Sequence, residues 1–257
     1  MKKILFLFGA LSLLLSSCSS NDDSSNEESQ LLLPKKIVET TVEDGESGSL
    51  TYTITYDGNK LKEISVSDAS KSVYTYTGDL ITKVEEFTSG VLIATDVYSY
   101  EGGKLISRIT TQAFNTTSKD KLTFVYNANG TVNANESEII NGQEIKYDST
   151  TLYTFLNGNL ISSEEINGEK EKISSTFDDK KSPFSNITGV KLLLDMDYFD
   201  FYSVNNTVKN TTVNYNSSGE VTQTATVTTT NTYNTSNYLT EVFSGNATDS
   251  FKLQITY

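Results

Sequence analysis

The sequence predicts an all-β protein whose strands form an antiparallel meander of hairpins, arranged as a twisted or curled open sheet. Thr, Ser, Asn, Tyr and Val are abundant, helix-forming Ala and Leu are sparse after residue 17, and Pro occurs only twice. One phrase of aromatic, polar and glycine residues recurs along the chain. Within it, apolar and polar residues alternate, as expected for a strand with one buried face.

The chain begins with the pattern of an export signal. Lys2 and Lys3 precede a short apolar run over residues 4–15. That run is too short for a membrane-spanning helix, which needs about 20 apolar residues. It matches the apolar core of a signal peptide.

The four residues Leu15-Ser16-Ser17-Cys18 resemble the lipobox of bacterial lipoproteins. The resemblance implies that residues 1–17 are cleaved off and that Cys18 carries a diacylglycerol on its thiol. Palmitate and similar acyl chains would then hold the protein on a membrane. The alternative is an ordinary secreted protein with a chance cysteine.

Residues 18–34 are predicted to form an acidic tether rich in Ser and Asn, followed by a single repetitive β domain over residues 35–257. Residues 19–30 of the tether lack the apolar residues needed to fold. Its acidic start resembles the surface-export signal of Bacteroidetes-type lipoproteins, which implies an outer-membrane protein exposed at the cell surface. A tether facing the periplasm is the alternative.

Composition excludes several kinds of chemistry. The chain has no His and no Trp, and its only Cys is Cys18. Catalytic triads that need His, the usual zinc ligand and disulfides are therefore excluded. Loss of the positive Lys2 and Lys3 takes the net charge from −13 to −15, so nucleic acid is an unsuitable partner. No cofactor is expected, and cations are weak candidate partners.

The recurring phrase is aromatic-x-aromatic, a polar or glycine turn, and an apolar residue that opens the next strand. Copies lie at residues 52–61, 74–80, 98–105, 124–132, 153–160 and 213–221, with a looser copy at 233–239. Turn residues such as Asp57-Gly58 supply the positive φ of a tight reversal. The variable spacing between copies indicates hairpins whose other connections tolerate changes in length.

The strand after each turn departs from strict alternation. Leu61 and Ile64 are three residues apart, as are other apolar pairs at the same place in the phrase. A three-residue offset cannot put both side chains on one face of a regular strand. A β-bulge or a turn–strand junction is predicted there.

The phrase resembles the YD repeat of Rhs-type and teneurin-type proteins, in which Tyr-Asp precedes a turn that contains Gly. Only Tyr56-Asp57 keeps the literal pair. The chain from about residue 35 to 257 is also similar to YD-repeat-like lipoproteins of Bacteroidetes, a family of unknown function. Residues 177–184, which end in Ser-Pro-Phe, match a phrase of that group that precedes an insertion. Seven or eight units are too few for the cargo shell of Rhs proteins.

One segment interrupts the meander. Residues 183–206 are predicted to form an irregular or short-helical insertion, dense in apolar and acidic residues. Asp195, Asp197 and Asp200 are weak candidates for Ca²⁺ ligands, because they lack the glycine and closing Glu of an EF-hand loop. A solvated loop is the better interpretation. The Asp178-Asp179 pair is a similarly weak candidate.

Three other groups of residues are candidate sites. The ladder of aromatic residues over 52–155 could stack glycans, but it fits better as the buried face of the sheet. Glu85-Glu86 and Glu164-Glu165 could serve a glycan hydrolase, yet neighbouring residues of a strand point to opposite faces. Ser149 lies in a short Asp-Ser-Thr pattern that resembles the O-glycosylation sites of Bacteroidetes proteins.

These observations favour a non-catalytic, membrane-anchored extracytoplasmic lipoprotein that serves as a surface binding module or an envelope structural module. A glycan or an extracellular protein is the expected ligand. The alternatives are a carboxylate-dependent glycan hydrolase and a periplasmic partner of a larger envelope complex. No catalytic residue, metal ligand or cofactor site is assigned, apart from the weak candidates above.

Overall fold

The computed structural model describes residues 31–167, 170–194 and 203–257. Residues Leu31–Tyr257 form one compact unit. Among the described residues, the strands are β1 (Lys36–Glu43), β2 (Glu46–Asp57), β3 (Lys60–Val66), β4 (Ser70–Thr77), β5 (Leu80–Thr88), β6 (Val91–Glu101), β7 (Lys104–Gln112), β8 (Asn115–Tyr126), β9 (Val132–Ile140), β10 (Gln143–Leu156), β11 (Asn159–Asn167), β12 (Glu171–Phe177), β13 (Thr207–Tyr215), β14 (Val221–Thr228), β15 (Thr230–Tyr233), β16 (Leu239–Gly245) and β17 (Ser250–Thr256). One 3-10 turn, η1 (Val190–Leu192), lies in the long connection between β12 and β13.

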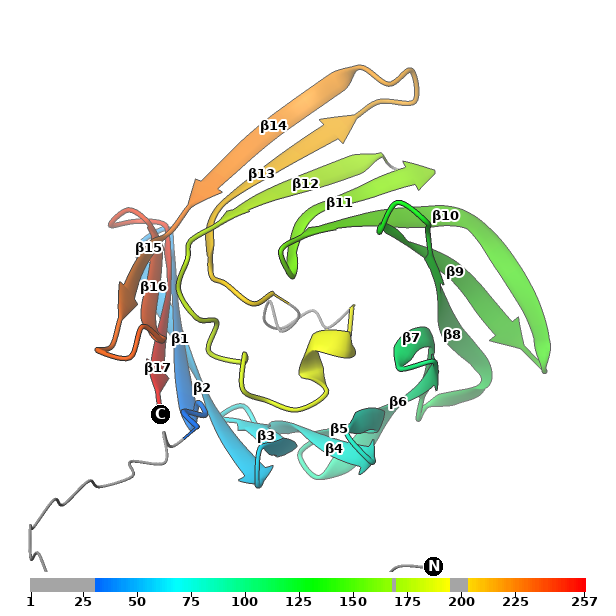
Figure 1. The fold of residues 1–257 in the computed structure, drawn as a ribbon, viewed down its shortest axis with the longest axis horizontal. Helices are drawn as coiled ribbons and strands as arrows, with labels where there is room; N and C mark the ends of the chain where they lie inside the picture. Colours follow the sequence, from blue (N-terminus) through cyan, green and yellow to red (C-terminus); the bar gives the residue numbers. More distant parts are fainter. Residues whose placement is uncertain (1–30, 168–169, 195–202) are drawn as a thin grey trace, which may run out of the picture. The chain divides into compact units, whose positions relative to one another are not determined.

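The predicted antiparallel meander of hairpins is confirmed. The sheet is more closed than the curled open sheet that the sequence predicted. Each strand pairs with its successor from β1 to β14 and again from β15 to β17. In addition, β17 pairs with β1 along seven residue pairs, from Lys36 opposite Thr256 to Val42 opposite Ser250. First and last strands therefore join, and the result is one nearly closed, barrel-like sheet (Figure 1).

Among the described strands, the ring is interrupted along β14 and β15. Only Thr229 separates these two strands, so they form one bent strand that changes partners. The first part pairs with β13, from Val221 opposite Tyr215 to Thr228 opposite Lys209. The second part pairs with β16. We call the discontinuity beside β14 the seam.

The inner face of the sheet holds the aromatic and aliphatic side chains. On β2, Tyr52 and Ile54 are buried while the intervening Thr53 and Thr55 are exposed. Buried Tyr74, Tyr98 and Phe124 hold the same place on β4, β6 and β8. The aromatic ladder is thus the core of the sheet, as predicted.

A β-bulge sits beside the turn in most copies of the phrase, which confirms the predicted irregularity. Tyr56 is opposite Leu61 but Thr55 is opposite Glu63, so Lys62 is the extra residue. The bulge returns Leu61 and Ile64 to the same face, where both are buried. The same shift occurs opposite Tyr76, Tyr100, Phe155, Tyr215 and Tyr233.

The second aromatic residue of a phrase has a further role that the sequence analysis missed. Strands β5 and β6 stop pairing at Lys83 opposite Val97, so the Ile81 carbonyl lies beyond the ladder. Tyr100 donates its hydroxyl to that carbonyl at 2.7 Å. Two further tyrosines donate in the same way at other strand pairs, Tyr126 to Leu105 O at 3.0 Å and Tyr257 to Leu239 O at 2.8 Å. A tyrosine here therefore satisfies a backbone acceptor that the diverging strands leave behind.

None of the helices in the described part of the chain is long and apolar enough to cross a membrane.

Candidate functional site

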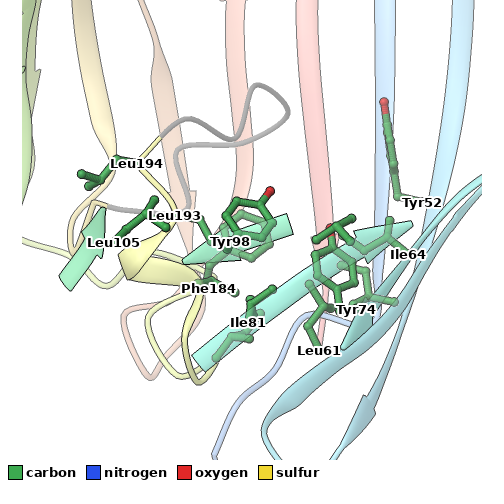
Figure 2. Close-up of a cluster of buried hydrophobic side chains, with 14 of the residues drawn as sticks. Tyr52, Leu61, Ile64, Tyr74, Ile81, Tyr98, Leu105, Phe184, Leu193 and Leu194 are labelled. Carbon is green, nitrogen blue, oxygen red and sulfur yellow. The ribbon is translucent and has the colours of Figure 1, made fainter. Parts of the chain in front are cut away.

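The described part of the long connection between β12 and β13 lies inside the ring (Figure 1). We call its described part, residues 178–194 and 203–206, the plug. Phe184, Ile187, Val190 and Leu193 of the plug are all buried, and they join the same core cluster as the strand residues. In Figure 2, Phe184 and Leu193 lie close to Tyr98 of the sheet. The plug supplies apolar cover that the inner face of a single-layer sheet needs.

Hydrogen bonds fix the plug to one end of the sheet, the end with the β2–β3 and β4–β5 turns. The Thr188 amide donates to Asn59 O in the β2–β3 turn at 3.0 Å. Tyr76 of β4 donates its hydroxyl to Thr188 O at 3.0 Å and accepts from the Leu61 amide at 3.1 Å. We call this the plugged end.

Gly189 is required where the plug meets the β4–β5 turn. Its φ is +83°, and a Cβ there would lie 2.7 Å from the Asp79 carbonyl oxygen. Any side chain at this position would therefore push the plug away from the wall.

The start of the folded unit also closes the plugged end. Pro34 is fully buried, and Tyr56 donates its hydroxyl to Pro34 O at 2.7 Å. Asn186 of the plug donates through Nδ2 to Leu32 O at 3.0 Å and to the Tyr238 hydroxyl at 2.8 Å. Residues 31–34, which the sequence analysis placed in the tether, thus belong to the folded unit.

Asp178 anchors the plug where it leaves β12. Its carboxylate accepts the Asn206 amide at 3.2 Å, the Lys180 amide at 2.9 Å and the Tyr233 hydroxyl. Asn159 holds the returning chain in a similar way, because its Oδ1 accepts the Val204 and Asn205 amides at 3.0 Å. These polar side chains have structural partners, and a Ca²⁺ role for the Asp178-Asp179 pair has no support from this geometry.

A pocket of about 260 Å³ opens on the wall formed by β2–β6, near the end opposite the plug. Its apolar lining is Leu50, Tyr52, Ile64, Val66, Tyr74, Phe87 and Ile93, and its polar lining is Asp68, Ser70, Lys71, Ser72, Glu86 and Thr88. Several of these residues flank the β3–β4 and β5–β6 turns. A concave wall that combines apolar side chains with polar groups is typical of small-ligand sites.

Local contacts hold the pocket rim in place. Asp68 Oδ1 accepts the Ser70 amide at 2.9 Å, which stabilises the β3–β4 turn. Lys71 lies 3.0 Å from Glu63 Oε2, and its Nζ is 5.3 Å from the centre of the Phe87 ring. Burial strongly raises the pKa of Tyr74 at the base, and nearby Glu86 adds to the shift, so this phenol stays neutral at physiological pH.

Four of the residues singled out from the sequence lie outside the described residues: Cys18, Asp195, Asp197 and Asp200. Ser149 is described. It lies on β10, where the pairing with β9 is interrupted between Lys146 and Thr150, and its hydroxyl donates to Glu165 Oε1 at 3.4 Å. Its glycosylation stays a prediction.

The two glutamates of each pair have different neighbours, as expected for adjacent residues of a strand, whose side chains point to opposite faces of the sheet. Glu86 lines the inner pocket, while Glu85 forms an ion pair with Lys83 at 2.8 Å. Glu164 pairs with Lys172 at 2.8 Å, and Glu165 accepts from Ser149. Within the described parts of the chain, no group of three or more His, Cys, Asp or Glu residues is placed to hold a metal ion.

Comparison with known proteins supports the fold alone. No family model matches the chain, and no curated protein matches it at a significant level. The structure is similar to the crystal structure of a porin-like protein from Bacteroides uniformis ATCC 8492, with a TM-score of 0.52 and 14% identity. The match covers 87% of this chain and 96% of that one. The resemblance to YD-repeat-like lipoproteins stays a prediction.

We expect the fold to lose stability in alkaline solution. Burial raises the pKa of Tyr76 from 10.0 to about 12, and it raises the pKa of Tyr56 and Tyr257 as well. A group whose pKa is higher in the folded state than in the unfolded state stabilises the fold at pH values below its unfolded-state pKa. This contribution is lost as the pH rises through the folded-state pKa. The free energy of unfolding in urea should therefore fall between about pH 10 and 12.

A Tyr76→Phe variant should show a smaller fall over the same pH range, because one ionising group has been removed. Tyrosinate absorbance should rise together with unfolding. A chain whose tyrosines all titrate near 10.0 while it stays folded would contradict their burial.

Proposed function

We propose that this protein is a lipid-anchored, non-catalytic binding module of the bacterial cell envelope, and that the pocket on β2–β6 receives one end of a glycan. The observation that carries the proposal is the pocket itself. It places the aromatic residues Tyr52, Tyr74 and Phe87 beside hydroxyl and charged groups within about 260 Å³. That is space for one sugar ring rather than for an extended chain.

Aromatic side chains next to polar groups suit a sugar. The rings supply flat apolar surface, while Ser70, Ser72 and Glu86 supply hydrogen-bonding groups of the kind that sugar hydroxyls need. The site lies on paired strands rather than on long loops, so binding would require little ordering of the protein.

The outer face of the sheet supports a domain surrounded by water. Hydroxyl residues alternate with the buried aromatics, as Thr53 and Thr55 do on β2 and Ser99 does on β6. Ion pairs such as Lys121–Glu144 at 2.8 Å also lie on the sheet surface. A barrel-like sheet is compatible with an association with the outer membrane or the envelope, and we propose that the lipid on Cys18 supplies the attachment at the cell surface.

The position of residues 31–34 fits this attachment. The folded unit begins at the plugged end, where Leu32 and Pro34 contact the plug and β2. A tether from Cys18 would join the domain at that end. The pocket, near the opposite end, would then face away from the point of attachment.

The anchor is tested by Cys18→Ala, with Ser19→Ala as the matched control. Cells fed a labelled palmitate analogue should label the wild type and the control but not Cys18→Ala, which should leave the membrane fraction. Protease treatment of intact cells should cut the wild type. Retention of Cys18→Ala in the membrane would contradict lipid anchoring, and resistance to protease until permeabilisation would place the domain in the periplasm.

The pocket is tested by glycan binding to the full chain. We expect at least one sugar in an array of mono- and oligosaccharides to bind, and Ser72→Leu, which fills the pocket, to weaken its affinity about tenfold or more. Ser99→Leu on the outer face is the matched control and should bind normally. Binding unaffected by Ser72→Leu, or an array with no ligand, would contradict the glycan proposal.

A further inference from the structure

Phe114 is the most exposed large apolar side chain among the described residues, at 87% exposed. Together with Ala113 it forms the two-residue turn between β7 and β8. The two-residue turns β1–β2, β5–β6 and β9–β10, at the same end of the sheet, have a glycine of positive φ in the second position, as Gly90 shows at +78°. Neither Ala113 nor Phe114 has a positive φ. Turn geometry alone therefore gives no reason for an aromatic ring in water here.

The turn that carries Phe114 lies beside the pocket. The Ala113 amide donates to Ile93 O of β6 at 2.8 Å, and Ile93 lines the pocket. The Cα atom of Phe114 is about 3.8 Å beyond that of Ala113. On the other side, the Ser89 amide of the β5–β6 turn donates to Ala69 O of the β3–β4 turn at 2.9 Å. These three neighbouring turns, residues 67–69, 88–93 and 112–115, are called the rim.

We propose that Phe114 and Ile93 form a second sugar subsite, so that the protein binds an uncharged glycan of two or more rings. This inference rests on the glycan site proposed above. The pocket of about 260 Å³ has space for one terminal ring. The next ring would lie outside the pocket and pack its apolar face against the side chain of Phe114. Binding would thereby remove apolar surface of Phe114 from water.

The charge and the polar groups of the rim suit an uncharged sugar. Residues 88–95 and 110–118 contain no charged side chain, although the net charge of the chain is −13. Asn115 follows the ring and is opposite Gln112, so two amide side chains flank the turn. The Thr117 hydroxyl donates to Asn115 Oδ1 at 2.9 Å, which holds that amide beside the ring. Amides both donate and accept hydrogen bonds, as sugar hydroxyls do.

A lipid surface is the other class of partner that an exposed apolar turn could meet. Val91 of the rim is 65% exposed, so the rim offers aliphatic as well as aromatic surface. Segments that bind at anionic bilayer surfaces commonly carry Lys or Arg beside their apolar residues. Residues 88–95 and 110–118 have neither. The adjoining pocket and the amides beside Phe114 favour the sugar.

The dependence of affinity on glycan length tests the second subsite. Glucose, galactose, mannose and N-acetylglucosamine, each with its disaccharide and trisaccharide, are titrated calorimetrically into the full chain in a detergent that has no sugar headgroup. The wild type should bind the disaccharide of its preferred sugar about tenfold more tightly than the monosaccharide. Phe114→Ala should lose most of this gain and bind the monosaccharide normally, whereas Phe114→Tyr should keep the gain.

Controls separate the second subsite from the pocket. Phe243→Ala, at an exposed phenylalanine of β16 that does not line the pocket, should bind every sugar normally. Sugar binding that Ser72→Leu weakens but Phe114→Ala leaves unchanged at every length would overturn the second subsite alone. No binding to any of the sugars would overturn the glycan site itself and the second subsite with it.

Cosedimentation with vesicles of phosphatidylcholine and phosphatidylglycerol tests the lipid alternative. The chains carry Cys18→Ala, so that no acyl chain on residue 18 contributes. We expect Phe114→Ala to make no difference to the fraction that sediments with the vesicles. A fraction that falls with Phe114→Ala would show that the rim contacts lipid, and would overturn the inference.

Discussion

The constraint on which this structure depends is the burial of an apolar, aromatic sheet face by a single layer of strands. A sheet that is apolar on one side has to cover that side. Here the ring formed by β1–β17 pairing encloses it, and Phe184, Val190 and Leu193 of the plug fill one end. Closure of the ring and the plug inside it therefore both serve to bury the apolar face of the sheet. A ring without the plug would leave Ile81 and Leu105 open to water.

Curvature and polar satisfaction follow from the same repeated phrase. Each bulge opposite an aromatic residue bends the hairpin and keeps both apolar residues of the following strand inside, as Leu61 and Ile64 show. Where the strands then diverge, a tyrosine hydroxyl replaces the missing backbone donor, as Tyr100 does for Ile81 O. The phrase thus encodes strand, turn, bulge and hydrogen-bond partner together, which explains why it recurs while the spacing between copies varies.

Much of the hairpin structure could be predicted, because alternation, positive-φ turns and the three-residue offset are local signals. Closure could not, because it depends on pairing between Ile37 and Ile255 and on twist summed over many strands. The plug was predicted as an irregular insertion, yet its place inside the ring depends on Gly189 fitting against Asp79 O, a contact with no local signature. The pocket was missed for a similar reason, since Leu50 and Ile93 meet only when five strands have assembled.

Amide hydrogen exchange on the full chain tests the central claim most directly, namely that ring and plug form one cooperative unit. The Thr188 amide donates to Asn59 O, and the Leu193 amide lies in the buried plug. We predict that both exchange with the same opening free energy as amides of the paired strands β1 and β17, such as Ile37 and Ile255. Plug amides that exchange at nearly the rate of an unfolded chain, while the strands stay protected, would contradict the account.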